Sequence, residues 1–119
     1  APNCLIEKHN VRIDSTNACG IFRECDIVCE CLDKAESKQE LIETLLKAGR
    51  FTVIAGSGAA GFGKSNMVKT TKISDRMYVA GDLESSVEQM GSLWAPRVAL
   101  AAAHQANCVL EVLEERLCE

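Results

Sequence analysis

The chain alternates between continuously apolar and amphipathic stretches, and this alternation predicts its helices and strands. Residues 26–33 (DIVCECLD) contain β-branched residues and are almost continuously apolar apart from Glu30, which is typical of a buried parallel strand. Residues 35–48 carry an apolar stripe at helical spacing, and Gly49 is suited to end that helix. Because 51–55 (FTVIA) has the pattern of a second buried strand, this order predicts a parallel sheet with right-handed crossovers.

Weaker patterns precede this unit. Residues 4–11 mix apolar and polar positions in a way that predicts a short strand. Residues 14–16 (Asp-Ser-Thr) offer N-caps, so residues 16–25 are expected to contain one short helix despite Gly20. The chain is therefore expected to reach its first buried strand through a short strand and a short helix.

A different pattern begins in the second half. Residues 67–74 alternate and are rich in Thr and Val, which predicts a strand with one exposed face, and a turn leads to an apolar strand over 77–81. From Ala95 a long amphipathic helix is expected to run to the C-terminus, with Pro96 allowed in its first turn. The predicted fold is α/β, with a mostly parallel sheet, right-handed βαβ crossovers, an antiparallel extension and a long C-terminal helix. This is a partial Rossmann-like arrangement.

Composition and charge limit the class of protein. With 47% apolar and 25% charged residues, the 119 residues are expected to form a single domain, residues 1–119. The net charge of −4 argues against a nucleic-acid binder, because such binding needs clustered Lys and Arg. No apolar run approaches the roughly 18 residues of a membrane span, so we expect a cytoplasmic protein without a membrane partner. The start at Ala1, without Met, favours a piece of a larger protein.

Seven cysteines raise the question of disulfides or a metal site. Their number is odd, no Cys-x-x-Cys pair is present, and Cys29 and Cys31 lie within a predicted strand. We therefore expect reduced thiols that are mostly packed in the core, since a free Cys behaves as a small buried hydrophobe. A metal site and a reactive thiol stay open as alternatives, with Cys108 and Cys118 as the candidates outside the predicted strands.

The glycine-rich stretch 53–66 (VIAGSGAAGFGKSN) matches two phosphate-binding patterns. Its first three glycines fit the dinucleotide fingerprint Gly-x-Gly-x-x-Gly, and Gly58 to Ser65 fit the P-loop. Both patterns need a helix directly after the glycines, because the helix N-terminus binds the phosphate. Residues 66–73 are instead crowded with β-branched side chains, so we expect the glycines only to allow a tight loop. A P-loop nucleotide-binding domain, in which ATP binding would need Lys64, is kept as an alternative.

A third pattern involves a flavin. Residues 79–82 (VAGD) are followed at a short distance by a helix, as in flavin disulfide reductases, where the Asp binds a ribityl hydroxyl of FAD. Flavin disulfide reductases do not have a strand, an Asp and a helix like those of residues 26–48 before this motif. The tail of an FAD enzyme is therefore a further alternative only.

Three blocks together match nearly the whole chain. They are 26–43 (DIVCECLDKAESKQELIE), 54–66 (IAGSGAAGFGKSN), and 78–85 (YVAGDLES) followed by 95–113 (APRVALAAAHQANCVLEVL). In order and spacing these blocks resemble the C-terminal half of the ThiF/MoeB/HesA family, relatives of ubiquitin-activating enzymes. The resemblance is greater to ThiF-like than to MoeB-like members and extends over residues 3–117.

The resemblance implies an adenylyltransferase. Such enzymes use ATP and Mg²⁺ to adenylate the C-terminal glycine carboxylate of a small ubiquitin-like sulfur carrier protein, as in thiamine biosynthesis, and they are homodimers. It also implies site residues: Asp33 matches the Asp near magnesium and the ATP phosphates, and Lys38 matches a position where many relatives carry Arg. The residues themselves agree for Asp33, since open sheets bind ligands at the carboxyl ends of their strands. The alternative is that Asp33 only caps the next helix.

The family's nucleotide loop and its catalytic Arg and Lys residues belong to the N-terminal half, which does not precede Ala1 here. We therefore expect that these residues alone do not adenylate a carrier. A carrier-docking or dimerisation module without catalysis is the second hypothesis. On the last helix, His104 is expected to be a hydrogen-bonded structural residue, and segment 82–88 is expected to face either a partner or solvent.

Overall fold

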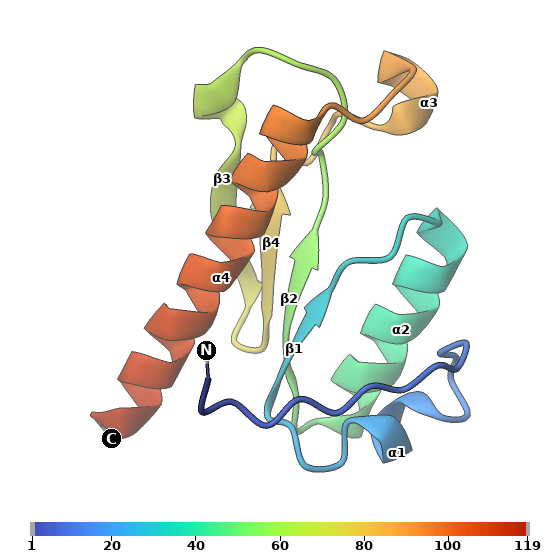
Figure 1. Cartoon of the computed structure of the whole chain (residues 1–119), viewed down its shortest axis with the longest axis vertical. Coiled ribbons are helices and arrows are strands. Elements are labelled where there is room, and N and C mark those ends of the chain that lie inside the picture. The colour runs from blue at the N-terminus through green and yellow to red at the C-terminus, as the bar shows by residue number, and fades with distance from the viewer. Residues whose placement is uncertain (1, 119) are drawn as a thin grey trace.

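The computed structural model describes residues 2–118, in which a four-stranded sheet lies between helices (Figure 1). The strands lie in the order β1-β2-β4-β3. β1 is parallel to β2 and β2 is parallel to β4, whereas β3 is antiparallel to β4. Their bounds are β1 Ile27–Glu30, β2 Thr52–Gly56, β3 Lys69–Ser74 and β4 Met77–Gly81. The predicted α/β fold with a mostly parallel sheet, one antiparallel pair and a long C-terminal helix is confirmed.

Helices cover both faces of the sheet (Figure 1). One face packs against α2 and the short α1, and the opposite face packs against the long α4. Because successive strand residues point to opposite faces, Val53 of β2 lies in the α2 cluster and its neighbour Ile54 lies in the α4 cluster. The helices are α1 Ala18–Ile21, α2 Ala35–Ala48, α3 Val87–Met90 and α4 Ala95–Leu117, and a 3-10 turn, η1, covers Ser65–Met67.

The ends of the two long helices follow the predicted rules. α2 ends at Gly49, whose φ of 73° is left-handed and whose amide donates to the carbonyl of Leu46. α4 begins directly after Trp94 and tolerates Pro96 in its first turn, as expected. In the part of the chain that the structure describes, no helix is long and apolar enough to cross a membrane.

One of the two N-terminal predictions is wrong. Residues 4–11 form no strand, and Leu5 and Ile6 are 92% and 72% exposed. A strand is stable only when its backbone pairs with a neighbour, and this segment does not join the sheet. The short helix expected within residues 16–25 is confirmed as α1, Ala18–Ile21, which includes Gly20.

The expectation that the cysteines are mostly core residues is also wrong. All seven thiols are free, and only Cys108 is buried. Cys29 in β1 and Cys31 directly after it alternate with Val28 and Glu30, whose side chains are buried on the α2 side. β1 is an edge strand of the sheet, and on its other face Ile27 packs partly against the α4 cluster whereas Cys29 is exposed. Burial raises the pKa of Cys108, so of the two cysteines considered for reactivity this one is a poor nucleophile.

Candidate functional site

The carboxyl ends of the three parallel strands meet at one edge of the sheet. β1 ends at Glu30, β2 at Gly56 and β4 at Gly81. The segment with Asp33, the glycine loop 57–64 and the acidic segment 82–88 leave the sheet from these three ends. Open α/β sheets bind their ligands at this edge, so it is the candidate site.

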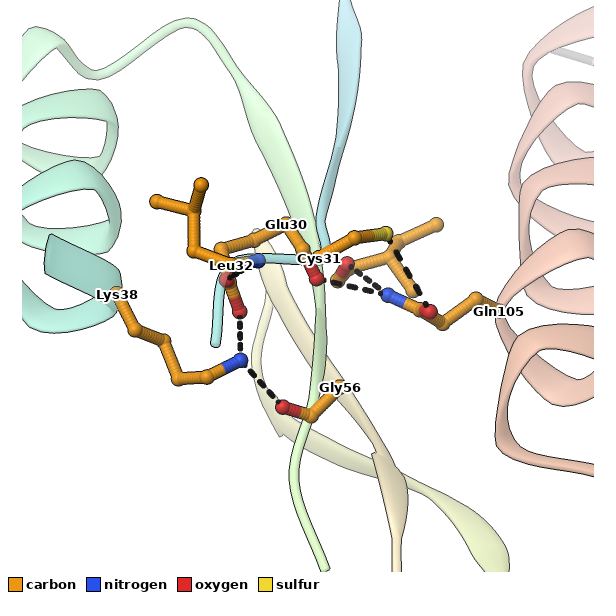
Figure 2. A network of polar contacts seen from close by, with 7 residues as sticks. Glu30, Cys31, Leu32, Lys38, Gly56 and Gln105 are labelled. Atoms are coloured by element: carbon orange, nitrogen blue, oxygen red, sulfur yellow. Dashed lines mark hydrogen bonds and ion pairs between the residues drawn. The ribbon is translucent and has the colours of Figure 1, made fainter. Parts of the chain in front are cut away.

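A buried ion pair joins the first two of these strand ends (Figure 2). The Glu30 side chain is fully buried, and its Oε2 lies 2.5 Å from Nζ of Lys38 on α2. Lys38 Nζ also donates to the Gly56 carbonyl at 2.7 Å, and the Leu32 amide donates to Glu30 Oε1 at 2.6 Å. The end of β1, the first turns of α2 and the end of β2 are therefore connected through one carboxylate and one ammonium group.

Gln105 of α4 reaches the same point from the other face of the sheet (Figure 2). Its Nε2 donates to the carbonyls of Glu30 and Ile54, each at 3.0 Å, and its Oε1 lies 3.7 Å from the Cys31 sulfur. These contacts give the buried Gln105 amide its hydrogen-bond partners, which a buried polar group needs. Sequence reasoning missed Glu30 and Gln105; the signal was a charged residue inside an apolar strand and an amide on a mostly apolar helix.

Asp33 lies next to this network at the carboxyl end of β1 and is exposed. The N-cap position of α2 belongs to Lys34 and carries no side-chain hydrogen bond, so the alternative that Asp33 caps the helix is wrong. Within residues 2–118 no ion pair engages the Asp33 carboxylate. The structure thus places the two predicted catalytic residues, Asp33 and Lys38, close in the chain but in different environments, since only Lys38 is paired.

The magnesium that the family resemblance implies would be held by Asp33, an exposed carboxylate at this edge. Among the described residues, no three His, Cys, Asp or Glu side chains come together as a metal cluster. Mg²⁺ is commonly bound by one or two carboxylates together with substrate phosphates and water. An exposed Asp33 fits that pattern, in which a nucleotide supplies the remaining oxygens.

The glycine loop lacks the geometry of either phosphate-binding pattern. The expected absence of a long helix after the glycines is confirmed: only the three-residue turn η1 separates the loop from β3. Arg97 of α4 lies beneath the loop, is 4% exposed, and donates to the carbonyls of Gly58 at 3.1 Å and Gly63 at 3.0 Å. A phosphate loop directs N–H groups toward an anion, whereas these two carbonyls converge on a cation.

Arg97 also fixes the acidic segment. Its Nη2 lies 2.5 Å from Oδ2 of Asp82, which also accepts a hydrogen bond from the Ser85 hydroxyl. The amides of Glu84 and Ser85 donate to Asp82 Oδ1 at 2.9 and 2.7 Å. Burial alone would raise the pKa of Asp82, but the hydrogen bonds from Ser85, Glu84 and Arg97 outweigh it and hold the pKa well below its usual range. The carboxylate that the flavin hypothesis would use is therefore engaged by the protein itself.

Two glycines make this close packing possible. A Cβ on Gly81, where φ is 146°, would lie 1.3 Å from the Ser57 carbonyl oxygen. A Cβ on Gly58, where φ is 81°, would lie 2.0 Å from Asp82 Oδ1. The glycines thus serve the approach of two backbone segments, as the loop interpretation expected.

His104 is the remaining residue considered from the sequence. Its Nδ1 lies 3.0 Å from the Thr70 hydroxyl of β3, so the expected hydrogen-bonded structural role is confirmed. Arg97, by contrast, was missed by sequence reasoning. Its only signal is an arginine in the first turn of an apolar helix, directly after Pro96.

Comparisons with protein-family models, with curated proteins and with solved structures found no match to this chain.

Proposed function

We propose that the chain is the C-terminal portion of a ThiF-like adenylyltransferase that acts on a ubiquitin-like sulfur carrier protein. The observation that carries this proposal is the position of Asp33, an exposed carboxylate beside a buried polar network at the carboxyl edge of a parallel sheet. The three sequence blocks that carry the family resemblance also meet at this edge. Lys38 connects the first block to Gly56 of the second, and Arg97 connects the glycine loop to Asp82 of the third.

In the proposed reaction, the carrier's terminal glycine carboxylate attacks the α-phosphorus of ATP. The bond to the β-phosphate oxygen breaks, pyrophosphate leaves, and an acyl-adenylate forms. Bound magnesium would neutralise phosphate charge. Asp33 would orient the magnesium–ATP complex, so the catalytic gain comes mostly from positioning and charge neutralisation. The protein is expected to be a cytoplasmic homodimer, as the resemblance implies.

A matched pair of variants tests this proposal in the full-length adenylyltransferase that it implies, the parent protein. Asp33→Ala should lower carrier-dependent ATP–pyrophosphate exchange by roughly 10²-fold while carrier binding is retained. Glu36→Ala removes another exposed carboxylate three residues later, in the first turn of α2, and should leave exchange within about twofold. Equal exchange by the two variants would show that Asp33 has no role in catalysis.

A second candidate function is docking without catalysis, and an exposed apolar patch favours it. The patch consists of Phe62, Met90, Leu93 and Trp94, which are 73%, 48%, 54% and 52% exposed. The Phe62 and Trp94 rings are in edge contact with centroids 6.0 Å apart, and the Gly61 amide donates to the Ser92 carbonyl. An exposed apolar patch of this kind marks a contact surface on many proteins. Carrier binding by the chain, combined with exchange in the parent protein that does not depend on Asp33, would support this candidate.

The P-loop alternative has its own test. If the glycine loop bound phosphate, the 119-residue chain would bind ATP and Lys64→Ala would abolish that binding. Because the carbonyls of Gly58 and Gly63 accept from Arg97, we expect that this loop does not bind phosphate. Lys64→Ala should therefore not change the ATP binding of the chain.

A further inference from the structure

The Glu30–Lys38 pair connects three segments at the candidate site (Figure 2). Glu30 accepts a hydrogen bond from the amide of Leu32, the residue before Asp33. Lys38 binds the other carboxylate oxygen and also the carbonyl of Gly56, where the glycine loop begins. The chain around Asp33 is thereby attached both to α2 and to the end of β2.

This pair is not needed to define the strand register. β1 and β2 are already paired over four residues, and Gln105 bridges the carbonyls of Glu30 and Ile54 from the other side. Burying an ion pair also carries a desolvation cost that commonly offsets most of its attraction. What the pair adds is a fixed path for residues 31–34, the short connection that leads into α2 and carries Asp33.

The Lys38 ammonium group has three N–H donors, and two of them are directed at Glu30 and Gly56. The side chain is 25% exposed, whereas its partner carboxylate is fully buried. A lysine with these contacts is suited to orient the surrounding backbone. Asp33, in contrast, is exposed, and its position depends on the neighbouring Leu32 amide and on the start of α2.

We propose that Glu30 and Lys38 are positioning residues that fix the Asp33 segment, so that its carboxylate is preorganised for a divalent cation. Lys38 acts through Glu30 and the backbone, and it does not contact the substrate. This inference rests on the proposed function, because that proposal assigns the cation to Asp33. Groups that orient a metal ligand typically change metal affinity by about 10- to 100-fold when they are removed.

The test uses the 119-residue chain with Mn²⁺ alone as a paramagnetic probe, and it measures the broadening of individual amide signals by NMR. The double variant Glu30→Gln/Lys38→Met removes both charges together and keeps an oxygen acceptor for the Leu32 amide. We expect it to weaken Mn²⁺ binding at the 32–34 amides about 10-fold. We also expect hydrogen exchange of the Leu32 and Asp33 amides to become at least about 10-fold faster, since the loop loses its ionic attachment.

Matched controls separate positioning from general effects. Lys47→Met makes the same chemical change on the last turn of α2, far along the helix from Asp33, and should change Mn²⁺ binding less than about twofold. Lys38→Arg keeps the cation and should restore binding to within about threefold of the native chain. If the double variant fails to fold, Glu30→Asp keeps the charge but shortens its reach by one methylene group, and it should reproduce the loss of Mn²⁺ affinity.

The outcomes distinguish this inference from the proposed function. Asp33→Asn should abolish the local broadening; if it does not, Asp33 is not the ligand of free Mn²⁺ and its preorganisation for a cation is refuted, whereas the proposed function, in which ATP supplies the other oxygens, is decided separately by the exchange assay of Asp33→Ala. If Asp33→Asn abolishes the broadening but the double variant binds Mn²⁺ like Lys47→Met, the positioning role is refuted and the proposed function stands. Unchanged amide exchange at Leu32 in the double variant would refute the positioning role by itself.

Discussion

Replacing Arg97 by methionine tests whether one buried guanidinium holds the glycine loop and the acidic segment together. The side chains of Arg97 and Asp82 are 4% and 8% exposed, so the pair is shielded from water. Removing one partner of a buried pair costs about 3–5 kcal/mol, because the other charge is left buried. In the variant, Asp82 keeps its hydrogen bonds from Ser85 and Glu84, and the lost Arg97 Nε had no partner among the described residues. We therefore expect a loss of unfolding free energy at the lower end of this range, about 3 kcal/mol.

The assay is urea unfolding of the chain, followed by circular dichroism. A domain of this size has a free energy of unfolding of roughly 6–18 kcal/mol, and its dependence on urea is about 2 kcal/mol per molar. A loss of about 3 kcal/mol therefore lowers the midpoint by roughly 1.5 M with an unchanged slope. The Gly61 amide, which donates to the Ser92 carbonyl beside the loop, should also exchange faster.

Arg116→Met is the matched control for this prediction. Arg116 forms an ion pair with Asp26 at 3.6 Å, but the two side chains are 37% and 75% exposed, and it also donates to the Thr52 hydroxyl at 2.9 Å. Exposed pairs contribute about 0–1 kcal/mol, so this variant should lose no more than about 1 kcal/mol. If the two variants unfold within about 0.5 kcal/mol of each other, the reasoning about the buried Arg97 is refuted.

Two further predictions concern the same region, and a third, in α1, is their control. The lowered pKa of Asp82 means that its ionised form stabilises the fold above the unfolded pKa of about 4, and that this contribution is lost as pH falls toward the folded pKa. The urea midpoint of the native chain should therefore fall more steeply below pH 4 than that of Asp82→Asn, and parallel pH profiles would contradict this. Gly81→Ala places a Cβ 1.3 Å from the Ser57 oxygen and should cost more than about 3 kcal/mol or prevent folding. Gly20→Ala, with no atom within 4 Å of its Cβ and a place in α1, should be neutral or stabilising by up to about 1 kcal/mol in the same urea unfolding measurement.

The fold could be predicted from sequence where the hydrophobic periodicity agreed with the residues that begin or end an element. The helix over residues 35–48 has an apolar stripe and a glycine at its end, and α2 matches it residue for residue. Residues 4–11 had neither a strong alternation nor a defined partner, and the structure leaves them unpaired and exposed. A strand forms only by pairing with another strand, and a single segment of sequence does not show whether an edge is available to it.

The candidate site was only partly predictable. The position of Asp33 at the end of a parallel strand follows from the order of the elements, because the carboxyl ends of parallel strands lie at one edge. The partners of Lys38 could not be deduced in this way. Glu30 lies eight residues before it, Gly56 lies 18 residues after it, and only the packing of α2 against the sheet brings these groups together.

The sequence by itself determined the α/β class, the two long helices and the absence of a long helix directly after the glycine loop, because these depend on local periodicity and on glycine and proline. Only the tertiary structure decided that Arg97 joins Gly58, Gly63 and Asp82, since these residues are separated by 15 to 39 positions. It also decided that Cys29 and Cys31 are exposed, because β1 is an edge strand with no neighbouring strand beyond it. Burial and ion pairing depend on which segments meet in space, and a one-dimensional pattern does not contain that information.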